Sequence, residues 1–310
     1  MTLSFARLAV LLTCYNRKPQ TLACLKALYA QTGLQEQQIT VYLVDDGSTD
    51  GTTEAVRSQY PEVKVIAGTG QLFWNGGMHL AFERALAQDY DGYIWLNDDT
   101  LLYPEAIATL LDTAQKIAAQ GDPVRSGAAI VAGSTRDPQT KELTYGGMRQ
   151  LSSLLPPFKA RPVEPLNVPQ RCDMMCGNIV LIPRAVAQKV GNLDPTLTHY
   201  AGDWDYGLRA KQEGCTVWIA PGYQGTCSDN PRPQALSTAT LDESLSKIQQ
   251  PKGLMLNDVT LHPWQEWKHL MRRHGGWLWW LFWLLPYRRL WWQMLWQRGE
   301  AAAASSPPAE

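Results

Sequence analysis

The sequence predicts an α/β protein in which helices flank a mostly parallel central sheet. Short apolar runs alternate with segments whose apolar residues recur at helical spacing, the pattern of strands joined by helices. The chain has 310 residues, enough for one large α/β domain or about two smaller units. Hydrophobic residues make up 45% and charged residues 18%, which excludes disordered, collagenous and coiled-coil chains.

The predicted elements follow one another in regular order from the N-terminus. Apolar runs predict strands at 8–13 and 39–44, and between them Leu22, Leu25 and Leu28 recur at helical spacing. Apolar residues between 107 and 118 fall on one face of a further helix. The remaining predicted strands are 63–67, 93–96, 128–132, 179–182 and 216–220, and the remaining predicted helices are 52–60, 77–87, 184–190 and 203–213.

Charge and cysteine content exclude several kinds of partner. Lys and Arg total 28 against 29 for Asp and Glu, and this net charge of −1 gives no overall attraction to nucleic acid. The six cysteines fit neither a disulfide framework nor a paired CxxC zinc site, which favours a reducing compartment. The apolar stretch before Thr13 spans about six residues, too few for a signal peptide. We therefore expect a cytoplasmic protein.

Two carboxylates follow the second predicted strand. In VYLVDDGSTDGT, Asp45 and Asp46 come directly after a buried run and precede a tight turn. Ligands of open α/β sheets bind at the carboxyl ends of the strands, so these acids are candidate ligand-binding residues. The alternative is that Asp-Gly-Ser-Thr-Asp-Gly serves only as turn and helix-cap sequence.

A second acidic group follows the strand at 93–96. YIWLNDDT brings Asn97, Asp98 and Asp99 to the same edge of the sheet, where clustered acids repel one another unless a cation intervenes. Mg²⁺ or Mn²⁺ is held by one or two carboxylates and takes its other ligands from water and substrate phosphates. The sequence therefore predicts a divalent cation and a diphosphate substrate, with a solvated Asn/Asp loop as the alternative.

Four motifs in order resemble the family 2 glycosyltransferases, which have the GT-A fold. They are LLTCYNRKPQTLACLKAL, LVDDGSTDGT, the strand followed by NDD, and GNIVLIPRAV…VGNLD…GDWDYGLRAKQEG. The resemblance covers about residues 8–227 and is nearest to the bacterial rhamnosyltransferase-like branch that builds surface polysaccharide. It implies a GT-A, Rossmann-like catalytic domain over 1–227, with a nucleotide-binding half of about 1–132 and an acceptor half of about 133–227.

The resemblance also implies roles for the residues that bind the nucleotide-sugar donor. Asp45 falls near the base with Asp46 beside it, and Asp99 is the metal ligand in the DxD position that Asn97 opens. Asp98 contacts the ribose or the metal. The other implied nucleotide contacts are Thr13, Tyr15, Asn16 and Arg17.

The glycine-rich segment GTGQLFWNGGMHLAF matches the segment that opens a helix in this family. Asn75 belongs to the implied donor site, and the amides of Gly76 and Gly77 near a helix N-terminus suit an anion or sugar hydroxyls. Trp74 is either a platform for sugar stacking or an ordinary buried aromatic residue.

The motif HYAGDWDYGLRAK matches the acidic motif of the family, with Gly202 in place of the usual Glu. Asp203 then falls at the position of the catalytic base for inverting transfer, in which one carboxylate takes the proton of the acceptor hydroxyl. The alternative is a helix N-cap. Trp204 and His199 are candidate acceptor contacts, and Cys227 stands where related enzymes often carry a metal-binding His. Five prolines between 145 and 170 predict a long excursion that forms part of the acceptor site.

The C-terminal part of the chain is rich in tryptophan and basic residues. Nine of the 13 tryptophans lie between Trp264 and Trp296, and 262–298 carries six Lys or Arg against one acid, Glu266. The apolar run WLWWLFWLL has nine residues, whereas about 20 are needed to cross a bilayer. We therefore expect 262–298 to form membrane-interfacial helices, after a polar loop region at 228–261 and before a disordered tail at 299–310. The alternative is a hydrophobic lid or a dimer contact.

These features together predict an inverting, metal-dependent glycosyltransferase. It would move one sugar from a nucleotide-sugar donor to a polyprenyl-diphosphate-linked, O-antigen-type surface glycan, as a peripheral protein on the cytoplasmic face of the inner membrane. The chain lacks the QxxRW motif of processive synthases in the family, which implies transfer of single sugars. The alternatives are a sugar-nucleotidyltransferase and a non-catalytic, membrane-bound protein that binds nucleotide or glycan.

Overall fold

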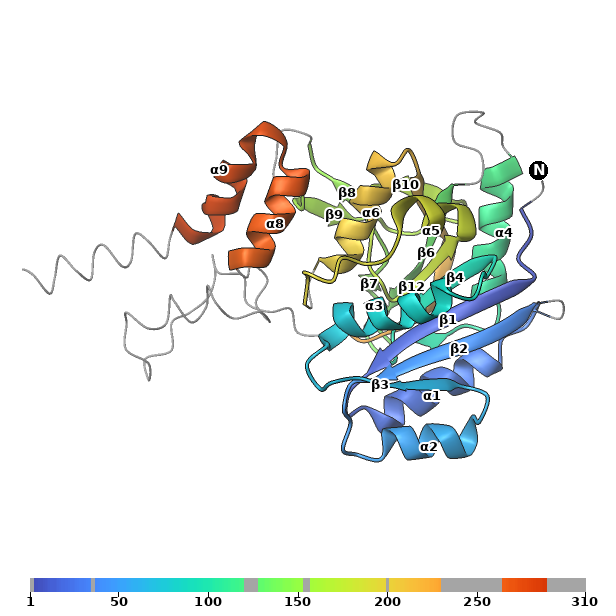
Figure 1. Ribbon diagram of the computed structural model, residues 1–310. Coiled ribbons are helices and arrows are strands. Elements are labelled where there is room, and N and C mark those ends of the chain that lie inside the picture. The colour runs from blue at the N-terminus through green and yellow to red at the C-terminus, as the bar shows by residue number, and fades with distance from the viewer. Residues whose placement is uncertain are drawn as a thin grey trace, which may run out of the picture. The chain divides into compact units, whose positions relative to one another are not determined.

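The structure is a computed structural model that describes residues 3–34, 37–119, 128–152, 157–198, 201–229 and 264–288. The chain divides into two compact units, Met1–Asn230 and Pro231–Glu310. The first unit contains a ten-stranded sheet and a separate three-stranded sheet, with helices packed around them (Figure 1). The predicted acceptor contact His199, most of the loop region and the tail lie outside the described residues.

The N-terminal half of the large sheet is parallel. Its strands are β1 (Arg7–Cys14), β2 (Gln38–Asp45), β3 (Lys64–Ala67) and β4 (Gly92–Leu96), in the order β3-β2-β1-β4. Every residue of β1 after Arg7 is buried, as expected for an unbroken apolar run covered by helices on both faces.

The other half of the sheet contains antiparallel strands. β12 (Ile179–Pro183) runs antiparallel between β4 and β6. The remaining strands of the large sheet are β6 (Ala129–Arg136), β13 (Thr216–Thr226), β10 (Gln170–Cys172), β5 (Leu101–Leu102) and β7 (Leu143–Tyr145). The three-stranded sheet consists of β8 (Gly147–Gln150), β9 (Ala160–Pro162) and β11 (Met174–Met175).

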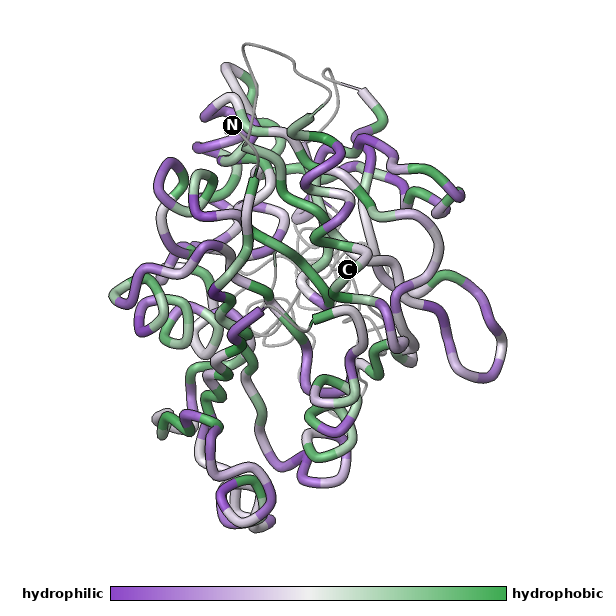
Figure 2. The backbone as a smooth tube through the Cα atoms, turned by 90° about the vertical axis from the view of Figure 1, so that its right-hand side faces the viewer, coloured by the Kyte–Doolittle hydropathy of each residue, from purple (hydrophilic) through white to green (hydrophobic). Residues whose placement is uncertain are grey.

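Helices cover both faces of the large sheet and enclose one hydrophobic core on each side. Alternation along β1 separates the cores, because Leu8 and Val10 belong to one and Ala9 and Leu11 to the other. Apolar residues accordingly concentrate along the central strands in Figure 2. The first core contains α1 (Lys18–Tyr29), α2 (Thr52–Gln59) and α4 (Ala106–Ala119), and the second contains α3 (Phe73–Leu86), α5 (Arg184–Val190) and α6 (Gly202–Gln212).

This architecture confirms the predicted α/β class with helices around a large central sheet, and it differs from the predicted elements in several places. The short strands β5, β7, β10 and β11 are not among the predicted elements. The excursion at 145–170 contains the strands β8 and β9, which no apolar periodicity predicts. The last predicted strand, 216–220, continues to Thr226 past an irregularity in its pairing with β6. Helix α3 begins at Phe73 rather than at 77, because Asp46 accepts hydrogen bonds from the amides of Leu72 and Phe73 at the helix start.

The described part of the second unit is helical. It contains α8 (Trp264–His274), η1 (Gly276–Leu278), α9 (Trp279–Leu284) and η2 (Leu285–Tyr287). Within the residues that the structure describes, no helix combines the length and the apolar character needed to cross a bilayer.

Close packing of α3 on β1 requires a glycine, and this can be tested. A Cβ built on Gly77 would lie 2.1 Å from Oγ1 of Thr13, so we expect Gly77→Ala to lower the free energy of unfolding by about 1–3 kcal/mol, measured by urea denaturation. Gly76→Ala is the matched control, because its nearest contact is 3.3 Å away and alanine favours the helix. Equal destabilisation by both substitutions would contradict this account.

Candidate active site

The carboxyl ends of the parallel strands bring the predicted site residues to one edge of the sheet. Cys14 pairs with Asp45 in register, and β4 runs parallel to β1 on its other side. The residues that follow β1, β2 and β4 therefore meet at this edge. Because β12 is antiparallel, it begins at the same edge, and Asn97 donates its amide hydrogen to the Asn178 carbonyl 3.0 Å away.

Asn16 joins the loop after β1 to the loop after β2. Its amide donates to Oγ of Ser48 at 2.8 Å, and its side-chain oxygen accepts from the amide of Thr49 at 2.7 Å. Asn16 has a φ of 51°, which Asn adopts more readily than most residues. Asp45 accepts from the Ser48 amide at 2.9 Å and from the Thr53 hydroxyl, so its carboxylate is fixed at the strand end.

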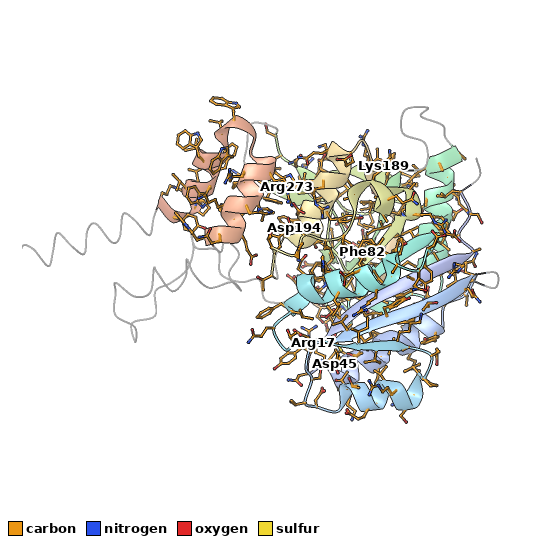
Figure 3. All side chains as sticks on the ribbon, viewed as in Figure 1. Arg17, Asp45, Phe82, Lys189, Asp194 and Arg273 are labelled. Carbon is orange, nitrogen blue, oxygen red and sulfur yellow. The ribbon has the colours of Figure 1, made fainter. Side chains whose placement is uncertain are left out.

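Arg17 holds the acid pair after β4. Its guanidinium contacts Asp99 at 2.7 Å and Asp98 at 3.3 Å, and Thr21 donates a further hydrogen bond to Asp98. Arg17 lies at the same end of the sheet as Asp45 in Figure 3. Burial raises the pKa of Asp98 to about 7, while Arg17 opposes that rise and Asp99 adds to it.

Cys227 lies beside the predicted metal ligand. Its thiol donates to Oδ1 of Asp99 at 3.4 Å, and the side-chain amide of Asn178 lies 3.5 Å from its sulfur. Burial, with a contribution from Asp99, raises the pKa of the thiol to about 12. In this arrangement Cys227 is a neutral hydrogen-bond donor, and its role as a metal ligand stays a prediction.

A chain of contacts joins the acid pair to Asp203. The indole of Trp74 donates to Oδ1 of Asn97 at 2.7 Å, and its ring lies so close to Gly177 that a Cβ there would be 2.3 Å from a ring carbon. Gly177 in turn donates its amide hydrogen to Asp203 at 2.8 Å. Trp74 is half-buried and packs between the two predicted acidic motifs, and its role as a platform for sugar stacking stays a prediction.

Asp203 lies in the first turn of α6 and keeps partial exposure to solvent. Its two carboxylate oxygens accept from the amides of Gly177 and Trp204, both at 2.8 Å. Burial raises the pKa of Asp203 to about 6, although the two amide hydrogen bonds favour the charged form. A carboxyl group with this pKa is ionised at neutral pH and remains basic enough to take a proton.

Several predicted donor contacts serve the protein itself. Asp46 accepts from the amides of Gly70, Leu72 and Phe73, so both of its oxygens anchor the glycine-rich loop. Gly76 donates its amide hydrogen to the Leu72 carbonyl at 3.1 Å, so this amide already has a partner at the helix start, and its predicted contact with the donor stays a prediction.

Asn75 and Gly77 are fully packed inside the unit. The Asn75 amide donates to the carbonyls of Asp194 and Leu197, and its Oδ1 lies where a Cβ on Gly202 would be only 1.9 Å away. Since the Asn75 side chain is completely buried, it positions the segment leading into α6 and is not open to a donor in this structure. Thr13 is buried against Gly77, whereas Tyr15 is 55% exposed at the strand end.

Sequence reasoning missed Phe158. Its ring stacks on that of Trp204, with the ring centres 5.9 Å apart and the ring planes 24° apart. Phe158 comes from the proline-rich excursion, which carries no periodic signal, so only the tertiary fold reveals that it stacks on Trp204, the residue after Asp203. The Phe158–Trp204 pair extends the predicted acceptor side of the site.

The residues at this edge can hold a divalent cation only if water and substrate supply most of its ligands. The described residues contain no group of three His, Cys, Asp or Glu that would enclose a metal ion. With both carboxyls ionised, Arg17, Asp98 and Asp99 carry a net charge of −1, and Asp99 retains 15% side-chain exposure. A hard cation held by one carboxylate, with water and substrate phosphates as its other ligands, is compatible with that donor set.

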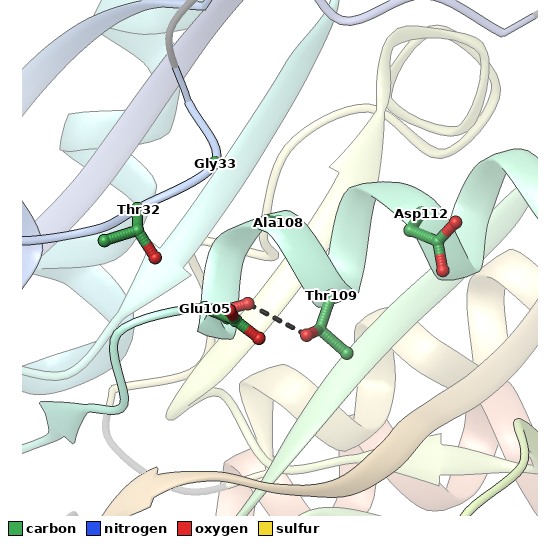
Figure 4. A pocket seen from close by; sticks show the side chains of 6 residues that line it. All are labelled: Thr32, Gly33, Glu105, Ala108, Thr109 and Asp112. Carbon is green, nitrogen blue, oxygen red and sulfur yellow. Dashed lines mark hydrogen bonds between the residues drawn. The ribbon is translucent and has the colours of Figure 1, made fainter.

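A separate depression lies away from this edge, between the segment after α1 and the start of α4 (Figure 4). It has a volume of about 270 Å³ and contains none of the predicted site residues. Its lining residues are Thr32, Gly33, Glu105, Ala108, Thr109 and Asp112.

The fold and the edge site define the chain as an α/β protein of the GT-A type. The sequence model of glycosyl transferase family 2 matches residues 9–190, more than half of the chain, and the protein therefore belongs to this family. The resemblance predicted from the motifs is thus confirmed. Within this family the chain resembles a rhamnosyltransferase.

The chain is 29% identical over 207 residues to N-acetylglucosaminyl-diphospho-decaprenol L-rhamnosyltransferase of Mycobacterium tuberculosis, in two strains. The match covers 60% of this chain and 64% of the relative, so the chain spans somewhat less than two thirds of that protein.

Solved structures support the fold. GalNAc-T7 with UDP, GalNAc and Mn²⁺ has a TM-score of 0.55 and 16% identity, over 73% of this chain and 44% of that one. The mannosyltransferase PcManGT of Pyrobaculum calidifontis, in complex with GDP-Man and Mn²⁺, has a TM-score of 0.50 and 16% identity, over 98% of this chain and 77% of that one.

The pairing of Arg17 with the acids predicts a pH-dependent loss of stability. In the wild type Asp98 has a pKa of about 7, because Arg17 opposes the rise that burial causes. Without the guanidinium that pKa rises further, and Asp98 and Asp99 repel each other when both are ionised. We expect Arg17→Met to lower the melting temperature by on the order of 3 °C at pH 8.5 and by much less at pH 5, where Asp98 is protonated.

Lys26→Met is the control, because it removes one exposed cation from α1, the helix that follows Arg17. Thermal unfolding of both variants and the wild type across this pH range makes the measurement. An effect of Arg17→Met that is the same at both pH values would show that the acid pair does not depend on it.

Proposed function

We propose that the chain is an inverting glycosyltransferase that moves one sugar from a nucleotide-sugar donor to a lipid-linked acceptor. The observation that carries the proposal is the contact chain from Asp99 to Asp203, through the turn 97–99, Trp74 and Gly177. This contact chain holds Asp203, the proposed base, close to the acid pair where we propose that the donor diphosphate binds. Family membership supports the reaction class, and the name of the mycobacterial relative supports a diphospho-polyprenol sugar as acceptor.

The proposed chemistry needs one proton acceptor. The acceptor hydroxyl forms a bond to C1 of the donor sugar while the bond from C1 to the diphosphate breaks and its electron pair leaves with the diphosphate. The hydroxyl proton passes to a carboxylate oxygen of Asp203. Asn16 and Asp45 fix the loops where we propose that the nucleotide binds, and Tyr15 and Arg17 complete that side. Trp204 and Phe158 line the acceptor side.

We further propose that Asp99 holds Mg²⁺ or Mn²⁺ together with the donor diphosphate. Such a cation supplies charge neutralisation for the leaving diphosphate. The structures of GalNAc-T7 and of the Pyrobaculum mannosyltransferase contain Mn²⁺, which supports a divalent cation in proteins of this fold. Arg17 forms an ion pair with both Asp98 and Asp99, and its positive charge offsets the repulsion between the two carboxylates.

The proposed biological setting is the assembly of a cell-surface polysaccharide at the cytoplasmic face of the inner membrane. The mycobacterial relative is named for a decaprenol-linked substrate, and an acceptor of that chemistry is embedded in a membrane. The nucleotide-sugar donor is water-soluble, so a peripheral enzyme reaches both substrates.

The proposed base is tested by substitution and pH. We expect Asp203→Asn to reduce transfer by about 10²–10⁴-fold while donor binding is retained, because the amide cannot accept the proton. Since the carboxyl has a pKa of about 6, kcat/KM of the wild type falls as pH decreases through 6.

The measurement is transfer to a short-chain lipid-linked acceptor, together with nucleotide binding by calorimetry. Glu213→Gln removes an exposed acid just after the same helix and is expected to behave like the wild type. Substantial turnover by Asp203→Asn would overturn the assignment, and release of diphosphate from a nucleoside triphosphate would instead indicate a nucleotidyltransferase.

The proposed cation site is tested by thermal stabilisation. We expect Mn²⁺ to increase the stabilisation of the wild type by UDP, GDP, CDP or dTDP, because a cation held by Asp99 would neutralise the charge of the diphosphate. Asp99→Asn is expected to lose that increase, and Asp112→Asn, which removes an exposed acid on α4, is expected to keep it. An unchanged Mn²⁺ effect in Asp99→Asn would refute the metal assignment.

A further inference from the structure

The aromatic residues of the second unit fall into an inner and an outer set. The inner set joins α8 to the segment after it: Trp264 and Trp283 have ring centres 4.4 Å apart, and Trp264 and Tyr287 have ring centres 4.9 Å apart. The indole of Trp283 also donates to the Trp264 carbonyl, and that of Trp267 donates to the Phe282 carbonyl. These rings therefore hold the two helices together.

The turn between the helices is fixed by two glycines. The Gly275 amide donates to the Met271 carbonyl at 2.7 Å, and a Cβ at this position would lie 2.6 Å from that oxygen. Gly276 has a φ of 57°, which favours glycine. The residues that follow the turn are consequently held in a defined conformation.

The outer set follows this turn directly and faces solvent. Trp277 is 84% exposed, Trp280 is 51% exposed and Leu281 is 37% exposed, whereas Phe282 beside them is 8% exposed. Exposed apolar surface is unfavourable in water, so three neighbouring exposed apolar side chains indicate a partner. We call Trp277, Trp280 and Leu281 the outer ridge.

The helical segment that contains the outer ridge also carries cationic side chains. Residues 264–288 contain Lys268, Arg272, Arg273 and Arg288 against one acid, a local charge of +3. The Arg272 guanidinium lies 5.5 Å from the centre of the Trp279 ring and is exposed, and Arg288 is exposed as well. A surface of this kind complements an anionic partner.

From this arrangement we propose that the outer ridge inserts into the boundary between headgroups and acyl chains of an anionic bilayer. Trp favours that boundary, and Arg pairs with anionic headgroups there. The inner set holds the hairpin together and does not itself enter the lipid. This inference gives the proposed enzyme its membrane contact, but it does not depend on the proposed chemistry.

The features of the ridge favour lipid over a second copy of the chain. The three side chains expose on the order of 400 Å², whereas a stable interface buries about 800 Å² on each partner. Two copies would also bring two surfaces of charge +3 together. A bilayer imposes neither limit.

The test uses the full chain and vesicles of either pure phosphatidylcholine or phosphatidylcholine with phosphatidylglycerol. We expect the wild type to sediment with the anionic vesicles, and the double variant Trp277→Ser/Trp280→Ser to bind them at least about tenfold more weakly. Arg272→Gln is expected to weaken binding to anionic vesicles and to leave binding to neutral vesicles unchanged. The matched control is Leu166→Ser/Val168→Ser, which removes exposed apolar side chains from the first unit and is expected to bind like the wild type.

Two outcomes would overturn the inference. One is anionic-vesicle binding by the double variant that equals that of the wild type. The other is sedimentation equilibrium showing that the substitutions abolish self-association and leave vesicle binding intact, which would make a second copy the occupant. Donor-dependent thermal stabilisation of the same variants separates this test from the proposed function, because we expect the ridge substitutions to leave it unchanged.

Discussion

The pairing of Arg17 with Asp98 and Asp99 is the interaction on which the candidate site depends. Two carboxylates follow β4 directly, and Asp98 is only 5% exposed, so the turn needs a positive charge close by. Arg17 supplies that charge from the loop after β1. Thr21 and Cys227 add hydrogen bonds from α1 and from just after β13. The acid turn thus joins the first and last strands of the unit, and its geometry depends on both halves of the sheet.

The antiparallel β12 explains how Asp203 reaches the edge occupied by the acid turn. A parallel strand after β4 would begin at the opposite edge of the sheet, whereas β12 begins beside the end of β4. Gly177 therefore lies next to the turn, and its amide binds Asp203. Glycine is needed there because the Trp74 ring occupies the space of a side chain. One strand direction and one glycine position the proposed base.

The sequence reveals the strands and the acids at their ends, because an apolar run and the residue that follows it are local features. Strand direction is not local: nothing in Ile179–Pro183 distinguishes an antiparallel strand from a parallel one. The hydrogen-bond partners of a polar side chain are not local either. Asp45 and Asp46 are neighbours in the sequence, yet Asp46 accepts from three amides of the glycine-rich loop, 24 to 27 residues away. Phe158 escapes prediction for the same reason.

Composition predicts that the second unit is aromatic and basic, but not which of its aromatic side chains are packed and which are exposed. Nine tryptophans in one stretch indicate an interface, while only the fold shows that Trp264 and Trp283 pack together and that Trp277 is exposed. Charge is divided just as unevenly. The whole chain carries −1 and residues 264–288 carry +3, so the remaining residues carry −4. Because salt screens charges beyond about 8–10 Å, an anionic surface responds to the nearest charges rather than to the total. A chain that is acidic overall therefore still carries a basic, tryptophan-rich segment suited to the membrane contact that we propose.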